Sequence, residues 1–485
     1  MRQVPWGDGS DMVNDIQWDH EADVVIIGGG TAGLPAAIRL RELGQKATVL
    51  EWRPQCGGSL GMIVGAVAFA GSDEQKAAGI EDSPELLTKD LVEVGGAVPE
   101  IAKATSEAQV EAYDIFRQEG FKWPGIVALP GHSVVRGMGW MLNYGPPVVQ
   151  CLENKARKVG AEILFRHRAT KLIQDPDTRR VVGVMVEAGD KRSDKRTLNF
   201  KAKKGVIIGS GGFGRNKEMI REWSPHMVTC VPKMPISHMG DGLKMALQLG
   251  AATKDIGVAT AGSWPVCVET HSRCIWALDW GGIMINADGK RFFKESSDEG
   301  FYGRMTEAGM RQPGGVYWVV FDQWVYDHVG TTQVKGTIER NMAHLRDIDW
   351  CVKVKADTPE ELGKLACFNP GNFKQTLARY NGDIEKRGYD TEFERRYQFG
   401  LARPVQTLNP PFYAVKCVTS LTSMKGGLKV DPEMRVIDHY DEPIPGLYAA
   451  GEATGGLWSK SYMLAVMTSG SMAQGIIAAK SALKY

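Results

Sequence analysis

The chain has 485 residues, a formal net charge of +1, and 43% hydrophobic and 24% charged residues. This length exceeds what one ordinary hydrophobic core supports, so two or three domains are expected. The nearly balanced charge gives no reason to expect nucleic acid or an anionic membrane as a partner. No apolar run approaches the roughly 20 residues that span a bilayer, and the polar, acidic N-terminus is unlike a secretory signal. We therefore expect a cytoplasmic protein.

The first predicted unit is a dinucleotide-binding fold. Residues 23–27 form an apolar run typical of a buried strand, and residues 47–50 form a second one that ends in Glu51. Between them lie a helical pattern and three glycines at GxGxxG spacing: Gly28, Gly30 and Gly33. Such glycines allow a tight turn, approach of the backbone to a pyrophosphate, and close packing of helix on strand. The helix would direct its first N–H groups at the diphosphate, and Glu51 suits a ribose diol.

Later segments favour FAD over NAD, which the fingerprint alone does not separate. A second glycine-rich stretch, residues 52–71, supplies small residues and hydroxyls beyond the ribose. Near the C-terminus a short apolar strand runs into Glu452, whose carboxylate can accept hydrogen bonds from ribitol hydroxyls. The final helix, from about Thr468, would point its positive end at a flavin ring, which is negatively charged when reduced.

Cysteines and metal-ligand patterns add no second redox centre. The eight cysteines are scattered singly, without a CxxC or an iron–sulfur spacing. This is typical of reduced thiols in a cytosolic enzyme, and it indicates that a redox cofactor is held without cysteine ligands. We expect no metal site, because no His, Cys, Asp and Glu grouping has ligand spacing.

Together these motifs resemble the FAD-binding flavoprotein family of fumarate reductases and succinate dehydrogenases, which includes 3-ketosteroid dehydrogenases. Beyond the fingerprint, the matching segments follow the family's order: GGS at 57–59, GVIIGSGGFGRN at 205–216, GDGLKMALQLGA at 240–251, INADGKRFFKE at 285–295, GGLKVD at 426–431 and PGLYAAGE at 445–452. The FAD contacts predicted from the fingerprint and this resemblance are Gly28, Gly30, Gly33, Glu51, Gly58, Ser59, Gly65, Ala169, Gly211, Asp241, Glu452, Thr468 and Ser469.

The resemblance also implies the architecture. We expect an α/β chain with a Rossmann-like FAD-binding domain, formed by residues 1–251 and 409–485, and an inserted α+β capping domain at 252–408. The segment at 209–214 repeats the GxGxxG spacing, but no strand ending in an acid follows it. A separate nicotinamide-binding domain is therefore not expected, and an external electron donor, NAD(P)H or a soluble reductase or carrier, is implied.

The residues that would hold a dicarboxylate are replaced. Fumarate reductases grip their substrate with arginines and histidines, and ungapped matching from the shared Glu452 places Tyr462 where the proton-donating arginine stands. A second arginine corresponds to Glu299, and a histidine before the GG pair corresponds to Ser423. A small acid such as fumarate is therefore the less favoured substrate, since Glu299 would repel it.

A tyrosine at this position is what 3-ketosteroid dehydrogenases carry, together with another in the capping domain near Tyr302. In those enzymes the tyrosine begins the motif Tyr-x-Gly-Pro-Gly, whereas residues 462–466 of this chain read Tyr-Met-Leu-Ala-Val. The missing glycines indicate a different reaction on the ring. A phenol with a pKa of about 10 is a ready general acid at neutral pH. Tyr462 and Tyr302 are the catalytic candidates, and Lys460 is close enough in sequence to lower the pKa of Tyr462.

Four residues are candidates for substrate contact: Glu299, His132, Trp140 and Lys425. His132 and Trp140 lie on a loop that resembles the family's flavin-adjacent segment, where a structural role is the alternative.

The predicted function is hydride transfer between flavin N5 and a cyclic, uncharged, polyphenolic or ketonic substrate. The length and the lost cationic clamp are similar to those of enzymes that reduce tetrahydrodaidzein to equol, which is the specific reaction we expect. Three alternatives remain open: an enone reductase or 3-ketosteroid-type desaturase, a fumarate-reductase-like enzyme for a small acid, and a flavin-binding electron carrier without a substrate.

Overall fold

The computed structural model describes most of the chain. The described residues are 16–61, 67–127, 129, 131–138, 145–190, 194–265, 277–278, 280–295, 301–328, 331–332, 340–341, 354–398 and 404–484, excepting the side chains of 127, 260–265, 301–303, 328, 331–332 and 340–341. Within these ranges no helix is both long enough and apolar enough to cross a membrane.

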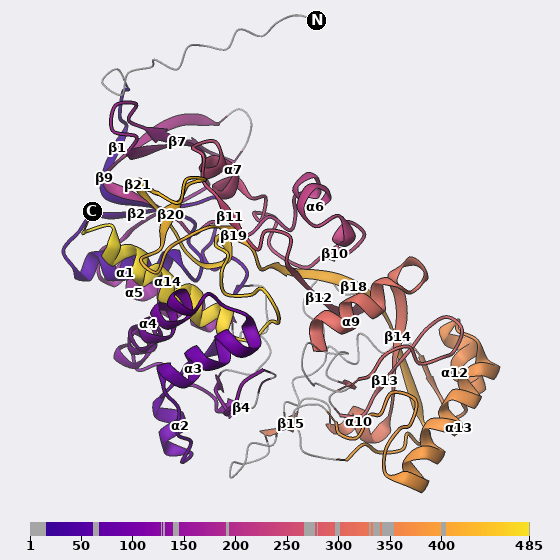
Figure 1. Ribbon diagram of the computed structural model, residues 1–485. Helices are drawn as coiled ribbons and strands as arrows, with labels where there is room; N and C mark the ends of the chain where they lie inside the picture. The colour runs from indigo at the N-terminus through magenta and orange to yellow at the C-terminus, as the bar shows by residue number, and fades with distance from the viewer. Residues whose placement is uncertain are drawn as a thin grey trace, which may run out of the picture.

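The first lobe is built on a mostly parallel sheet in the order β20-β21-β9-β1-β2-β6, extended by an antiparallel arm of β7 and β8 (Figure 1). Its strands are β1 (His20–Ile27), β2 (Ala47–Glu51), β6 (Glu162–Phe165), β7 (His167–Gln174), β8 (Val181–Ala188), β9 (Arg196–Ile208), β20 (Arg435–Ile437) and β21 (Pro443–Ala449). The central β1 lies between β2 and β9, in parallel with both. It is buried over its apolar half because helices and the antiparallel arm cover the sheet.

Helices of this lobe cluster beside the sheet (Figure 1). They are α1 (Gly33–Glu42), α2 (Asp73–Ala77), α3 (Pro84–Asp90), α4 (Pro99–Gln118), α5 (Gly145–Lys158), α6 (Lys217–Trp223), α7 (Asp241–Leu247) and α14 (Val466–Ser481). Helix α14 packs between α1 and α4 and is buried on nearly every side. Small residues permit this burial: a Cβ atom on Gly475 would lie 2.1 Å from the carbonyl oxygen of Ala32, just before α1.

The second lobe has its own sheet, centred on β18, and its own core. Its strands are β10 (Val231–Pro232), β12 (Ala259–Pro265), β13 (Ile283–Ile285), β14 (Val316–Asp322), β17 (Val354–Ala356) and β18 (Phe412–Met424). Its helices are α9 (Phe301–Met310), α10 (Gln323–His328), α12 (Pro359–Ala366) and α13 (Pro370–Arg387). A buried ion-pair group supports this lobe, with Arg291 contacting Glu295 and Asp390.

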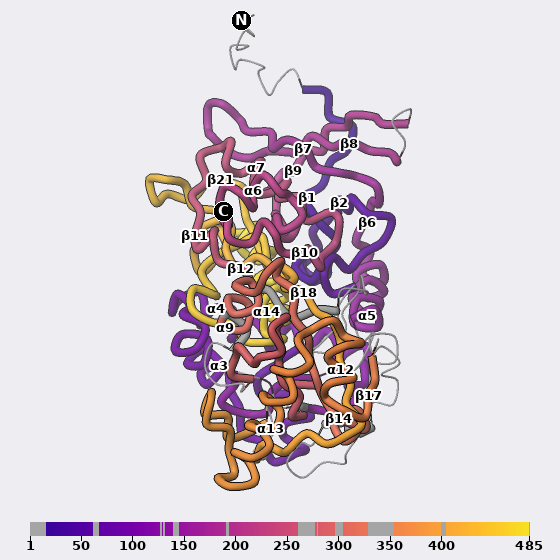
Figure 2. The backbone as a smooth tube through the Cα atoms, turned by 90° about the vertical axis from the view of Figure 1, so that its right-hand side faces the viewer, coloured from indigo at the N-terminus to yellow at the C-terminus, as the bar shows by residue number. Residues whose placement is uncertain are grey.

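Two strands connect the lobes. The chain leaves the first lobe through β12 and returns through β18, which pairs antiparallel with β12 (Figures 1 and 2). Strand β18 starts in the second core and ends in the first: Cys417 belongs to one and Leu421 to the other. The arrangement confirms the predicted α/β class, whereas the boundaries at 251–252 and 408–409 stay a prediction.

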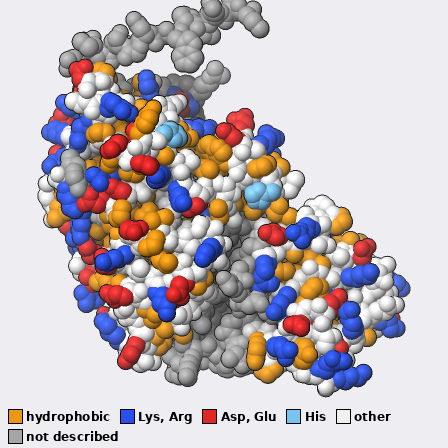
Figure 3. Space-filling model, in the orientation of Figure 1, with side chains coloured by type: hydrophobic (Ala, Val, Ile, Leu, Met, Phe, Trp, Pro, Cys, Tyr) orange, Lys and Arg blue, Asp and Glu red, His pale blue; other side chains and the backbone are white. Residues whose placement is uncertain are grey.

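Short elements complete the fold. These are β3 (Val67–Ala68), β4 (Ile126–Val127), β5 (Gly137–Met138), β11 (Thr253–Lys254), β15 (Thr331–Thr332), β16 (Arg340–Asn341), β19 (Gly427–Leu428), the π-helical turn η2 (Leu91–Gly95), and the 3₁₀ turns η3 (Pro225–Met227), η4 (Pro313–Gly315) and η5 (Gly451–Ala453). The face drawn in Figure 3 carries acidic and basic side chains interspersed over both lobes, in keeping with the near-zero net charge.

Candidate active site

The glycine-rich turn between β1 and α1 packs tightly against backbone at Gly28 and Gly33 but leaves free space at Gly30. A Cβ atom on Gly33 would lie 1.9 Å from the carbonyl oxygen of Gly28, and one on Gly28 would lie 2.5 Å from that of Gly209. A Cβ on Gly30 would meet nothing within 4 Å, so the backbone can be approached there, as a diphosphate requires. No side chain caps the first turn of α1, so this helix end, whose dipole favours an anion, is not occupied by a side-chain oxygen.

Glu51 stands at the end of β2 beside this turn. Its Oε2 accepts a hydrogen bond from the N–H of Gly29 at 2.8 Å, and its Oε1 accepts one from the N–H of Arg53 at 2.7 Å. Burial raises the pKa of Glu51, while these two N–H groups oppose the shift. Each oxygen keeps acceptor capacity for a ribose hydroxyl.

A chain of polar side chains continues from the turn toward the C-terminal segment. Ser59 Oγ lies 3.2 Å from Nε2 of His238, and Nδ1 of His238 lies 3.7 Å from Oε2 of Glu452. Glu452 also accepts a hydrogen bond from the N–H of Met424 at 2.9 Å. Burial lowers the pKa of His238, although Glu452 opposes the shift, so the imidazole is neutral at neutral pH. The structure thus joins the predicted Ser59 and Glu452 through His238, which the sequence did not single out.

The second glycine turn covers this polar chain. Gly211 has a φ of 78°, and a Cβ there would lie 2.7 Å from Nε2 of His238; one on Gly212 would lie 2.8 Å from Oε1 of Glu452. Ser210 Oγ and Nδ1 of His238 are buried without a hydrogen-bond partner. Such orphaned atoms, next to backbone that tolerates no side chain, fit the hydroxyls of a long cofactor. FAD therefore suits the site, with the GxGxxG turn at its diphosphate and Glu51 at its ribose.

Two predicted FAD contacts lie on the antiparallel arm and on α7. Ala169 is buried in β7, paired with Val186 of β8. Asp241, at the start of α7, accepts two hydrogen bonds from Arg168, at 2.6 Å and 2.9 Å. The Arg168 guanidinium lies 4.1 Å from the ring centre of Trp52. Because Arg168 engages both oxygens of Asp241, an FAD contact of this carboxylate stays a prediction.

Three further predicted contacts lie near the two helix starts. Gly58 has a φ of 51°, and a Cβ on it would lie 3.6 Å from the Cα of Gly30. Thr468 and Ser469 are buried in the first turn of α14, whose cap residue Ala465 has a φ of 72° and offers no side-chain hydrogen bond. The 16-residue helix therefore presents uncapped N–H groups at this end.

Tyr462 lies in an aromatic cluster with a buried lysine. The Nζ of Lys425 is 3.2 Å from the ring centre of Tyr462 and donates a hydrogen bond to Ser423 Oγ at 2.8 Å. Trp458 packs edge-on against Tyr462, with ring centres 5.5 Å apart. Lys425 is only 2% exposed. The sequence predicted a pocket that has lost its cationic clamp, and the structure places one amine in it.

Burial sets the protonation states of this pair. Burial first, and then Glu452, raises the pKa of the Tyr462 phenol, whereas a hydrogen bond from the N–H of Ala465 lowers it. Burial also lowers the pKa of Lys425 well below its usual value, with Glu452 opposing. At neutral pH the Tyr462 phenol thus keeps its proton, and the Lys425 amine binds a proton less readily than an exposed lysine does.

The expected influence of Lys460 is wrong. Lys460 is exposed, and its backbone N–H bonds the carbonyl oxygen of Gly95. The pKa of Tyr462 is raised rather than lowered, because burial dominates. The chain turns away at Lys460 and buries Tyr462 against Lys425 instead, a contact that sequence proximity could not reveal.

Of the remaining candidate site residues, His132 is described by the structure and the others are not. His132 uses both ring nitrogens within the protein, with Nε2 2.9 Å from the carbonyl oxygen of Leu464 and Nδ1 3.3 Å from Arg136. Gly65, Trp140 and Glu299 lie outside the described residues, as does the side chain of Tyr302. Their predicted roles stay predictions.

This chain belongs to the family described as the FAD binding domain, which matches residues 23–465. A probable fumarate reductase of Shewanella frigidimarina is 27% identical over 503 residues, which cover 100% of this chain and 79% of that protein. A 3-oxosteroid 1-dehydrogenase of Mycolicibacterium smegmatis is 25% identical over 544 residues, covering 91% and 94% respectively. The solved open conformation of a flavocytochrome c3 fumarate reductase matches with a TM-score of 0.80 at 26% identity, covering 100% of this chain and 82% of that one.

These similarities and the built cofactor cradle define the class. The protein is an FAD-dependent oxidoreductase of the fumarate reductase and ketosteroid dehydrogenase type.

Two glycine substitutions separate folding from FAD binding. Gly33→Ala places a Cβ 1.9 Å from a carbonyl oxygen, so we expect a loss of unfolding free energy of roughly 1–3 kcal/mol or more. Gly30→Ala meets no protein atom, so the apoprotein should keep its stability within about 0.5 kcal/mol while FAD affinity falls. Thermal unfolding and flavin fluorescence titration measure the two effects. Normal FAD affinity of Gly30→Ala would contradict the proposed place of the diphosphate.

Lys425 makes stability depend on pH. Its folded pKa is lowered, so the unfolded chain binds more protons, and stability rises with pH between the folded and unfolded pKa values. Lys425→Met should remove up to about 1.4 kcal/mol per pH unit of this slope, and it should stabilise the protein most at the acid end of this pH range. The matched control is Lys103→Met, because the Lys103 side chain is 70% exposed. The free energy of unfolding is measured by urea unfolding at a series of pH values. If it depends on pH equally in Lys425→Met and in the wild type, the pKa of Lys425 is not lowered by folding.

Proposed function

We propose that this enzyme reduces a cyclic, uncharged substrate, and that the Tyr462 phenol donates the proton. The observation that carries the proposal is the phenol of the half-buried Tyr462, whose pKa is raised above its usual value and which therefore stays protonated. A protonated acid suits reduction, in which hydride and proton are both delivered to the substrate. FAD, when bound, supplies the two-electron hydride chemistry.

The charges around Tyr462 support an uncharged substrate. A dicarboxylate brings two negative charges, and each must be compensated in a buried site. Beside Tyr462 the structure offers Lys425, whose pKa is lowered, and Glu452, which acts on the pKa of both side chains and would repel an acid. The half-buried ring of Tyr462, packed edge-on against the buried Trp458, offers an aromatic surface that suits a flat ring instead.

Within this class, tetrahydrodaidzein is the specific substrate we propose, with equol as its product. The benzylic C–O bond breaks, the oxygen takes the proton of Tyr462 Oη and leaves as water, and the benzylic carbon takes the hydride. Tyr462 is then reprotonated from solvent. The two electrons come from an external reductant, NAD(P)H or a soluble reductase or carrier, and we place the enzyme in the cytoplasm.

Desaturation of a ketonic ring is the second candidate. It requires a proton acceptor, and Lys425 is one, because burial lowers its pKa well below the usual value. The similarity to a 3-oxosteroid 1-dehydrogenase supports this direction of chemistry. The raised pKa of Tyr462 disfavours it, since a tyrosine base needs a lowered pKa.

A reoxidation test distinguishes the candidates. Holoenzyme reduced with dithionite under anaerobic conditions is mixed separately with tetrahydrodaidzein, androstenedione and fumarate, and flavin absorbance and products are followed. We expect reoxidation by tetrahydrodaidzein with formation of equol. Reoxidation by fumarate alone would overturn the uncharged-substrate proposal. Bleaching of oxidised enzyme by a saturated 3-ketosteroid would establish the desaturase, and inertness to all three would remove tetrahydrodaidzein.

The role of Tyr462 is tested by removing one oxygen atom. Tyr462→Phe should keep its FAD content and lower kcat by about 10²- to 10⁴-fold. Because the pKa of the phenol is raised, wild-type kcat should show no loss from this group between about pH 6 and about pH 9. The matched control is Tyr440→Phe, since Tyr440 is 84% exposed. Wild-type kcat in Tyr462→Phe would assign the proton to another group.

A further inference from the structure

The segment that carries Tyr462 is held by the first lobe at two places. At its start, the N–H of Val98 bonds the carbonyl oxygen of Gly456 at 2.8 Å, and the Ser459 hydroxyl bonds that of Gly96 at 2.6 Å. At its end, Nε2 of His132 lies 2.9 Å from the carbonyl oxygen of Leu464, a residue 332 positions away in the chain. Both supports flank Tyr462 closely in sequence, so they hold the backbone that carries its ring.

The contacts of His132 specify its tautomer. Arg136 Nη1 lies 3.3 Å from Nδ1, and a guanidinium can only donate, so Nδ1 must accept. The carbonyl oxygen of Leu464 can only accept, so Nε2 must carry the proton. Burial, followed by Arg136, lowers the pKa of His132 to about 4, against the opposing effects of the Leu464 carbonyl, Asp90 and Asp82. The ring is therefore neutral, in one tautomer, across the neutral pH range.

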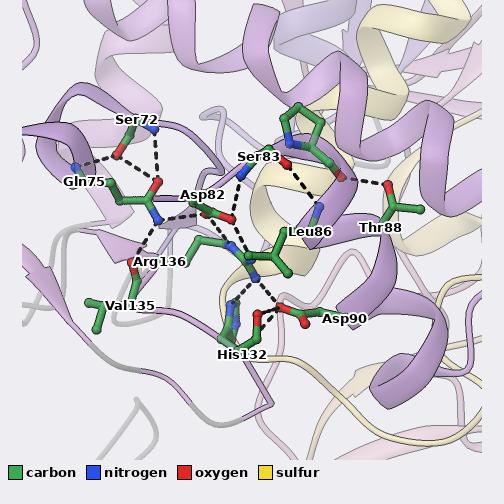
Figure 4. A network of polar contacts seen from close by, with 12 residues as sticks. Ser72, Gln75, Asp82, Ser83, Leu86, Thr88, Asp90, His132, Val135 and Arg136 are labelled. Atoms are coloured by element: carbon green, nitrogen blue, oxygen red, sulfur yellow. Dashed lines mark hydrogen bonds and ion pairs between the residues drawn. The ribbon is translucent and has the colours of Figure 1, made fainter. Parts of the chain in front are cut away.

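Arg136 is itself immobilised. Its guanidinium is fully buried and bonds both oxygens of Asp82, at 2.7 Å and 2.8 Å, and Oδ2 of Asp90 at 2.7 Å. Figure 4 shows His132 and the two aspartates converging on Arg136. Gln75 fixes Asp82 further with a hydrogen bond at 2.8 Å. A buried arginine with paired carboxylates is a rigid support for the histidine.

The bond from His132 falls on the segment that carries Tyr462. The carbonyl of Leu464 lies two residues beyond Tyr462 and shares one peptide unit with the N–H of Ala465. Ala465 has a φ of 72°, a left-handed conformation that costs energy for a residue with a Cβ. Such strain persists where surrounding contacts enforce it. Here His132 holds the peptide that precedes the strained residue.

We propose that His132 is a positioning residue: by donating to Leu464, it holds the Leu464–Ala465 peptide, and with it the segment that carries Tyr462, so that the phenol is oriented for proton transfer. The consequence for catalysis rests on the proposed function, in which Tyr462 is the proton donor. The physical coupling of His132 to the phenol does not, so the two can be measured separately.

Fluorine NMR of the holoenzyme labelled with 3-fluorotyrosine, without substrate, tests the coupling. Tyr462→Phe identifies the Tyr462 resonance by its loss. His132→Phe keeps the ring volume and loses the donor, so that resonance should shift or broaden. His132→Gln can still donate to Leu464 and accept from Arg136, so it should restore the resonance toward the wild-type position. The control is His226→Phe, because His226 is exposed.

Kinetics with tetrahydrodaidzein test the consequence. We expect His132→Phe to lower kcat by roughly 10- to 100-fold with little change in KM, and His132→Gln to recover most of it. An unchanged Tyr462 resonance in folded His132→Phe would overturn the proposal, as would His132→Gln behaving like His132→Phe. If His132→Phe does not fold, Asp90→Asn provides the test, because it weakens the support of Arg136, and an unchanged Tyr462 resonance in that variant would overturn the proposal. A shifted resonance together with full activity of Tyr462→Phe would instead refute the proposed proton donor.

Discussion

The cofactor site depends on backbone packed directly on backbone. Gly33 and Gly28 leave no room for a Cβ between the turn and the strands, and Gly475 lets α14 approach the start of α1 with the same closeness. These approaches bring the carboxyl ends of β1 and β9 together with the last helix of the chain. Because the parallel strands end at the same edge of the sheet, segments far apart in sequence meet there, and the N-terminal ends of α1 and α14 both belong to the predicted FAD site.

At the other end of the site, burial rather than ion pairing controls the chemistry. It raises the pKa of Tyr462 and lowers that of Lys425, so each side chain is pushed toward its neutral form. Neutral side chains compensate a doubly charged acid poorly, which supports the proposed uncharged substrate. Glu452, a predicted FAD contact, opposes the shift of the Lys425 pKa and adds to that of the Tyr462 pKa.

Local pattern made part of this site predictable. The GxGxxG turn and Glu51 lie within one strand–turn–helix–strand unit, so spacing alone placed them, and the resemblance to a known family extended the prediction to Ser59 and Glu452. His238 was not found, although it stands just before the predicted GDG segment, because its contact with Ser59 and its closeness to Glu452 join segments that are distant in the sequence. Lys460 was favoured for its closeness in sequence, whereas the three-dimensional fold places Lys425 against Tyr462.

The path of β18 explains why Lys425 reaches the site. The strand begins in the core of the second lobe and ends at Met424, whose N–H bonds Glu452, and Lys425 follows directly. Gly426 then presses against the carbonyl of Asp255, where a Cβ would lie 1.8 Å away, so the chain cannot swing outward. The same strand therefore supports the second lobe and delivers the amine. The position of the amine beside Tyr462 is therefore tied, through one continuous strand, to the core of the second lobe.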